Sequence, residues 1–210
     1  MKFIFSFMIF IFSQISFSAS SSSNWKLGVG FGYSINYLVN LSGSGVSSGT
    51  PYKITYYFEF SSATSIALDL RKLNKNNWGI MSGFEYETER TLTKLVANGI
   101  IIPLSGGATA KYQSHFLHLG AAYRWDIFYV PVGLTYGLTT FTPAPGSTGT
   151  ASIENGFGGY FGLGWYVDDD IVIEYVGRSV TTSLKVTSGA DSETTSGTIG
   201  SALLGLKAFF

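Results

Sequence analysis

The residue pair best suited to nucleophilic chemistry is Ser114 with His115, because a serine needs a nearby base to act as a nucleophile. The two residues are adjacent, and adjacent side chains in a strand point to opposite faces. They therefore do not come within hydrogen-bond reach of each other. The chain has no cysteine, which removes thiol catalysis, disulfides and cysteine-based metal sites. The sequence predicts no enzyme, no cofactor and no catalytic residues.

Three consecutive aspartates, at residues 168–170, offer oxygen ligands of the kind that calcium prefers. Three acids in a tight turn are more commonly solvated, and this second interpretation is preferred. No metal ligand is assigned.

Charged residues of both signs recur on one face of the strands that the sequence predicts. They are Lys26, Asp69, Arg71, Glu85, His118, Arg124, Glu174, Arg178 and Lys207. If eight strands close into a barrel, its interior is only wide enough for side chains to fill. The charges must then meet one another, since an unpaired buried charge is costly. The preferred hypothesis is a salt-bridge network that closes the interior, and the alternative is a path for protons or small ions. Glu174 is expected level with Lys207, and Glu85 level with His118.

The composition limits the class of protein. Lys+Arg and Asp+Glu are both 13, so the net charge is zero and nucleic acid is not an expected partner. Charged residues make up only 12%, against roughly 25% in ordinary soluble domains. Aromatic residues reach 16%, and there are 26 glycines. This composition favours a protein that is solvated by lipid on one side.

The last strand, at residues 198–210, shows the alternation most clearly. Counted back from Phe210, the residues Ala208, Leu206 and Leu204 share an apolar face. Lys207 and Gly205 lie on the other face, where small and charged residues mix. A continuous apolar face of this kind is typical of a strand whose outer side touches lipid.

Seven earlier segments alternate in the same way, which predicts an all-β fold of eight antiparallel strands. They cover residues 25–39, 52–72, 78–90, 109–125, 128–141, 151–167 and 171–186. The segment 52–72 is interpreted as one strand, because its apolar residues keep their phase across Ser61 and Ser62. The outward face is expected to include Tyr37, Val39, Phe58 and Phe60, with Arg90 also outward at a strand end.

Short and long connections alternate along the chain, as in an up-and-down transmembrane barrel. The short ones, at residues 73–77, 126–127 and 168–170, lie on the side of both chain ends. The four long ones, at residues 40–51, 91–107, 142–150 and 187–196, would face away from the cell. Tryptophans stand at the short-turn end of the strands and would form an aromatic girdle at the membrane interface: Trp25, Trp78, Trp125 and Trp165.

The N-terminus has the features of a secretory signal peptide. Met1 and Lys2 form a positive start, an apolar stretch runs to Ile15, and the small residues Ser18 to Ser20 suit cleavage. The sequence therefore predicts a cleaved signal peptide at 1–20 and a barrel domain at 21–210.

The eight alternating strands, their aromatic ends and the terminal Phe210 resemble the small outer-membrane proteins of the OmpA, OmpX, OmpW and opacity-protein type. The resemblance implies a bacterial outer-membrane location, with Phe210 as the signal for the barrel assembly machinery. It also implies outer-membrane lipid as a partner, and an extracellular ligand of the long loops. The expected function is structural or surface interaction through four extracellular loops, and the alternative is a narrow, porin-like channel for small solutes.

Overall fold

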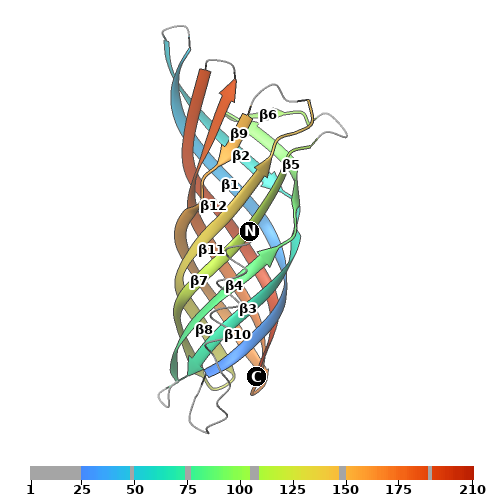
Figure 1. Ribbon diagram of the computed structural model, residues 1–210, viewed down its shortest axis with the longest axis vertical. Helices are drawn as coiled ribbons and strands as arrows, with labels where there is room; N and C mark the ends of the chain where they lie inside the picture. The colour runs from blue at the N-terminus through green and yellow to red at the C-terminus, as the bar shows by residue number, and fades with distance from the viewer. Residues whose placement is uncertain (1–24, 48–49, 74–76, 105–108, 147–149, 189–190) are drawn as a thin grey trace, which may run out of the picture.

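The structure, a computed structural model, describes residues 25–47, 50–73, 77–104, 109–146, 150–188 and 191–210. The predicted signal peptide lies outside these residues. Within them the chain forms a tall barrel of tilted strands with its C-terminus at the lower end (Figure 1). Twelve strands are present: β1 (Trp25–Ser47), β2 (Thr50–Phe60), β3 (Ala63–Leu73), β4 (Trp78–Glu87), β5 (Arg90–Ala97), β6 (Ile100–Ile102), β7 (Lys111–Trp125), β8 (Phe128–Thr142), β9 (Thr150–Ile153), β10 (Gly156–Asp168), β11 (Ile171–Ser188) and β12 (Asp191–Phe209).

The wall of the barrel is a closed antiparallel ring of eight strands, in the order β12-β11-β10-β8-β7-β4-β3-β1, which the β12–β1 pairing closes. Three of the wall strands continue upwards after a break, since β2 continues β3, β5 continues β4, and β9 continues β10. The predicted eight-stranded, antiparallel up-and-down barrel is confirmed. The predicted loops 40–51, 91–107 and 187–196 are strand for most of their length.

The stagger of the strands fixes the barrel's width. Following paired residues once round the wall from Trp25 leads back to β1 at Ile35, ten residues further along. Eight strands with this shear tilt by about 40° and leave an interior that side chains can fill.

The last strand has the faces that the alternation predicts. Lys207 and Phe209 point into the barrel and are 5% and 2% exposed, whereas Leu206 and Phe210 point outward and are 50% and 77% exposed. Hydrogen bonds in both directions between Leu27 and Phe210 join the ends of the chain. Phe210 thus lies where the first and last strands close the wall.

The expectation that the apolar face of the first two strands stays outward is wrong. Tyr37 and Val39 are 0% and 2% exposed, and Phe58 and Phe60 are also buried inside the barrel. The β1–β12 register shifts between Ile35 and Leu38. A shift of one residue turns every later side chain to the opposite face. The segment 52–72, predicted as one strand, forms two strands, β2 and β3, with a break at residues 61–62. Both strands keep one register against β1, but the facing of the side chains reverses at the break.

Four wall strands carry such a break. The breaks lie at residues 35–38, 61–62, 88–89 and 154–155. When the shear is divided equally among the strands, the four breaks fall within about two residues of one level along the barrel axis. Arg90, which follows the third break, is therefore buried and not outward.

The barrel reverses its polarity at this level. Below the breaks the outward side chains are apolar, with Phe31, Leu119 and Phe161 each more than 60% exposed. Above them the outward side chains are mainly hydroxyl and amide groups: Asn40, Ser42, Thr55, Thr91, Thr93, Thr140, Ser152, Thr181, Thr194, Ser196 and Thr198. The interior above the breaks is an apolar cluster, here called the upper core: Tyr37, Val39, Leu41, Phe58, Phe60, Leu92, Ala110, Tyr112, Phe116, Val180, Leu184 and Ile199.

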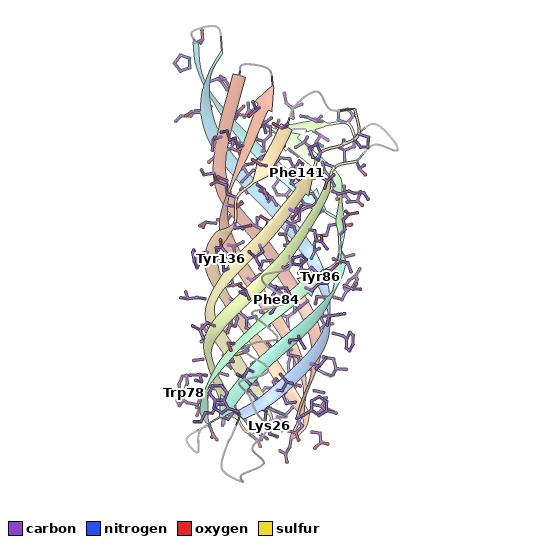
Figure 2. The ribbon with its side chains drawn as sticks, in the orientation of Figure 1. Lys26, Trp78, Phe84, Tyr86, Tyr136 and Phe141 are labelled. Carbon is purple, nitrogen blue, oxygen red and sulfur yellow. The ribbon has the colours of Figure 1, made fainter. Side chains whose placement is uncertain are left out.

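The apolar exterior has the height of a membrane. Trp25 lies eleven residues before Asn36, at the centre of the β1 irregularity. Eleven residues at about 3.3 Å each and about 40° of tilt span roughly 28 Å, and outer-membrane barrels carry an apolar band about 25 Å tall. Trp25, Trp78, Trp125 and Trp165 are exposed along its lower edge. Tyr86 and Tyr136 lie higher on the exterior than Trp78 (Figure 2).

Candidate functional site

Ion pairs lie in the lumen inside the apolar band, beside a cluster of buried apolar side chains that includes Tyr129, Tyr166 and Val172. The lower group of ion pairs centres on Lys207. The Lys207 Nζ lies 2.7 Å from Asp69 Oδ2 and 2.7 Å from Glu174 Oε1, and these three side chains are almost fully buried. They come from β12, β3 and β11. The expected Glu174–Lys207 pair therefore forms. The two residues are not direct partners in the ladder, because Lys207 pairs with Val172 and Glu174 pairs with Gly205.

His118 belongs to the same group. Its Nε2 lies 2.7 Å from Asp69 Oδ1. Gly83 stands between the two residues in the wall, and a Cβ on it would approach Asp69 Oδ1 to 2.2 Å and His118 Nε2 to 2.6 Å. A side chain at position 83 would therefore push the carboxylate and the ring apart.

Glu85 pairs with Arg178 across the lumen, and not with His118 as the sequence suggested. The Arg178 Nη2 donates to both carboxylate oxygens of Glu85, at 2.8 and 2.9 Å. Its guanidinium carbon lies 4.2 Å from the centre of the Phe116 ring. The expected pair of Glu85 and His118 does not form, because the ladder places Phe116 opposite Glu85, and Gly83 opposite His118.

The upper group was not predicted, because Arg90 and Tyr37 were expected on the outward face. Arg90 and Glu87 are fully buried and pair at 2.9 Å. Ser114 donates to Glu87 Oε2 at 3.1 Å, and the Tyr37 hydroxyl lies 3.1 Å from Ser114 Oγ and donates to Tyr112 at 2.6 Å. The sequence shows Glu87 and Arg90 three residues apart. The alternation alone does not show that a break between them turns both side chains inward.

Arg71 lies near the lower mouth among aromatic rings. Its guanidinium is 3.7 Å from the centre of the Phe209 ring and donates to the Tyr166 hydroxyl. Lys26 and Arg124, which were expected inside the network, lie at this mouth instead. Lys26 pairs with Asp170, both being about half exposed, and Arg124 pairs with the exposed Asp169 at 3.2 Å. They lie at strand ends, where the wall opens to solvent.

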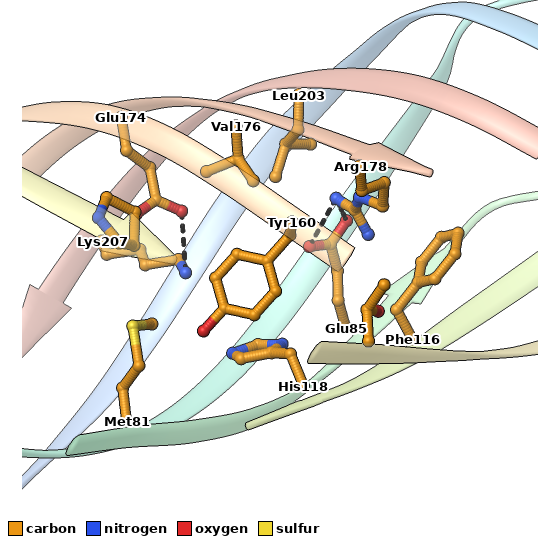
Figure 3. A pocket seen from close by; sticks show the side chains of 12 residues that line it. Met81, Glu85, Phe116, His118, Tyr160, Glu174, Val176, Arg178, Leu203 and Lys207 are labelled. Carbon is orange, nitrogen blue, oxygen red and sulfur yellow. Dashed lines mark hydrogen bonds and ion pairs between the residues drawn. The ribbon is translucent and has the colours of Figure 1, made fainter. Parts of the chain in front are cut away.

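The buried charges balance. Among the residues that the structure describes, four buried carboxylates, of Asp69, Glu85, Glu87 and Glu174, face four buried cations, of Arg71, Arg90, Arg178 and Lys207. A cavity of about 20 Å³ remains between the lower group and the Glu85–Arg178 pair, bordered by Tyr160, His118 and Glu174 (Figure 3). This volume holds roughly one water molecule. The Tyr160 hydroxyl and Glu174 Oε2 have no hydrogen-bond partner in the described part of the chain.

Ser114 and His115 lie on opposite faces of β7, as expected. Ser114 is buried in the upper ion-pair group, whereas His115 lies on the exterior and stacks on Tyr86, with ring centres 4.7 Å apart. Across the described ranges, no group of three histidine, aspartate or glutamate side chains is placed to hold a metal ion.

No helix among the described residues is long and apolar enough to span a membrane.

No protein-family model matches the chain, and no curated protein sequence matches it either. Solved structures similar in fold include two outer membrane proteins. The outer membrane protein OprG from Pseudomonas aeruginosa has a TM-score of 0.59 and 11% identity, over 90% of this chain and 96% of OprG. The outer membrane protein AlkL, solved in DMPC lipid bilayers, has a TM-score of 0.55 and 16% identity, over 91% of this chain and 92% of AlkL.

The closed wall, the apolar exterior and the filled interior define the chain as a transmembrane β-barrel. Its fold is that of the small eight-stranded outer-membrane barrels, as the resemblance implied. The predicted location, the bacterial outer membrane, is also that of OprG and AlkL.

Proposed function

We propose that this protein is an integral outer-membrane barrel that conducts no solutes and acts at the cell surface through its extracellular part. One observation carries the proposal. Buried carboxylates and cations in equal number meet across the lumen from different sides of the wall. A channel needs a hydrated path, whereas paired and desolvated charges leave no such path.

The upper core supports the same function as a second barrier. Its aromatic side chains fill the barrel above the ion pairs, where Tyr37 contacts Phe60 and Tyr112 with ring centres 6.0 and 5.0 Å apart. A solute entering from outside would first have to displace these rings. The extracellular part thus behaves as a packed domain with a hydroxyl-rich surface, which is suited to contacts with other molecules.

Two further elements of the proposal concern biogenesis. Residues 1–20 direct export and are removed, and Phe210 is read by the barrel assembly machinery before the wall closes. The exposed position of the Phe210 ring, at the seam between β1 and β12, leaves it available to a partner until the barrel is released into lipid.

Conductance decides between a closed barrel and the alternative of a narrow channel. The purified protein is reconstituted in planar bilayers, with a known porin as the positive control and protein-free membranes as the negative control. Insertion is checked by the heat-dependent shift of the folded barrel in gel electrophoresis. We expect no conductance steps and no swelling of liposomes in sugars. Steady single-channel steps from the folded wild-type barrel would replace this proposal with the channel.

A further inference from the structure

The β5–β6 hairpin stands above the membrane band and is joined by a tight turn. Its turn is Asn98-Gly99, with φ of 49° and 80°. Positive φ at both central residues is the type I′ turn that joins two strands tightly. The turn sets the register, in which Ala97 pairs with Ile100, Val96 with Ile101, and Leu95 with Ile102.

One side of β6 is an unpaired strand edge. In the parts of the chain that the structure describes, β6 pairs with β5 alone. In a two-residue hairpin the pair next to the turn is hydrogen-bonded, and hydrogen-bonded pairs alternate with open ones. Ile101 belongs to an open pair, so its N–H and C=O point away from β5. These two groups can accept another strand.

The edge is apolar and lies beyond the reach of lipid. Ile100, Ile101 and Ile102 are 70%, 64% and 38% exposed. Through β5, Ile102 and Ile100 are level with Phe58 and Tyr56, four and six residues above Ser62 at the break. They stand roughly 10–15 Å above the apolar band. Acyl chains end below this height, so lipid is not what covers the three isoleucines.

We propose that β6 is a docking edge for an extended, apolar segment of another protein outside the cell, which pairs with Ile101 as an added strand. Natural proteins protect exposed edges with charges, prolines, bulges or very short strands. β6 is three residues long and is followed by Pro103, but it carries no charge, and Ile101 keeps its outward N–H and C=O. An added strand would use the free main-chain groups for affinity, and the isoleucines on either face for selectivity. The type I′ turn holds the edge in its binding shape, so docking orders little of this chain.

This inference rests on the extracellular placement in the proposed function, but not on the closed lumen. The test uses the barrel in lipid nanodiscs and, as probe, a fluorescein-labelled octapeptide of alternating valine and threonine. Binding is followed by fluorescence anisotropy. Ile101→Pro removes the outward N–H, which β5 does not use, and is expected to weaken binding by about tenfold or more. Ile101→Thr keeps the main-chain edge and is expected to retain most of the binding.

Ile101→Lys provides a second block, by adding an edge charge without a proline. Folding of each variant is checked by the heat-dependent gel shift. Equal losses in Ile101→Pro and Ile101→Thr would mean simple hydrophobic adhesion, and would overturn the strand-addition proposal. So would a wild-type barrel that binds no peptide, or cross-linked dimers of the barrel that disappear in Ile101→Pro, since a second copy would then be the occupant. Conductance of the wild type would instead contradict the closed lumen and leave the peptide result standing.

Discussion

Arg90 donates a hydrogen bond from Nη1 to the main-chain carbonyl oxygen of Ser61, 2.9 Å away, and so joins two of the four breaks in the barrel wall. The same guanidinium pairs with Glu87 at 2.9 Å and lies 4.3 Å from the centre of the Tyr37 ring. Tyr37 follows the break in β1. One buried side chain therefore touches the wall at three of the four places where it reverses its facing.

Replacing Arg90 should destabilise the barrel. Arg90→Ala leaves the Glu87 carboxylate buried without its cation and the Ser61 carbonyl without its donor, at a cost of about 3–5 kcal/mol. The urea unfolding midpoint in lipid vesicles, followed by tryptophan fluorescence, measures the loss. Lys94→Ala on the same strand is the control, since Lys94 is exposed. An unchanged midpoint for Arg90→Ala would contradict the role of Arg90 at the breaks.

The lower ion-pair group predicts a second loss. Lys207→Ala leaves the buried carboxylates of Asp69 and Glu174 without their shared cation, and should lower the unfolding free energy by about 3–5 kcal/mol, less where water enters. The matched control is Lys26→Ala, whose partly exposed pair with Asp170 contributes about 1 kcal/mol or less. Equal midpoints for the two variants would show that the buried pair adds nothing to stability. Because the upper core stays intact, Lys207→Ala alone should open no large pore in planar bilayers.

A methyl group at position 83 tests the contact between Asp69 and His118. Gly83→Ala should cost roughly 1–3 kcal/mol through overpacking, since backbone and ion pair both crowd the site. Gly200→Ala is the control, because a Cβ there meets no atom within 4 Å. The unfolding midpoint in vesicles separates the two variants. If the two variants have equal unfolding midpoints, the space at Gly83 is not what keeps the ion pair in place.

The reversal of polarity can be measured with an arginine placed at two heights on one strand. Leu206 and Thr198 both face outward on β12, one inside the apolar band and the other above it. Leu206→Arg should cost about 2–4 kcal/mol, and Thr198→Arg close to nothing, because the cost of a lipid-facing charge falls towards the interface. Comparable losses from the two variants would place the upper edge of the membrane elsewhere.

The sequence predicts well wherever one period-two pattern persists along a strand. Leu206 and Lys207 show this, since an apolar outside and a mixed inside continue to the end of β12. Tyr37 and Phe60 show where the prediction fails. Tyr37 keeps the phase of the apolar residues before it, and Phe60 that of the apolar residues after it, yet the breaks turn that phase from lipid to core. Hydrophobicity is the same for a lipid-facing and a core-facing residue, so the pattern does not distinguish them.

Contacts across the lumen between strands that are not neighbours also could not be predicted from the sequence. Glu174 and Lys207 lie on neighbouring strands, and proximity along the ladder was enough to expect their pair. Glu85 and Arg178 lie on strands that are not neighbours, and their contact depends on shear and side-chain length. His118 contacts Asp69 because the residue between them in the wall is Gly83, which has no side chain to keep them apart. The sequence shows that glycine but not what it separates.

The reversal of the barrel wall sets how deeply the protein sits in its bilayer. Raising the barrel by two residues would bring Tyr33 and Ile35 towards water, and lowering it would draw Thr198 and Thr181 into hydrocarbon. The tryptophans at the lower edge oppose both movements. The depth of the barrel in the bilayer is therefore fixed at both edges of the apolar band. A thicker bilayer must thin around this barrel, since moving the barrel up or down would not reduce the mismatch.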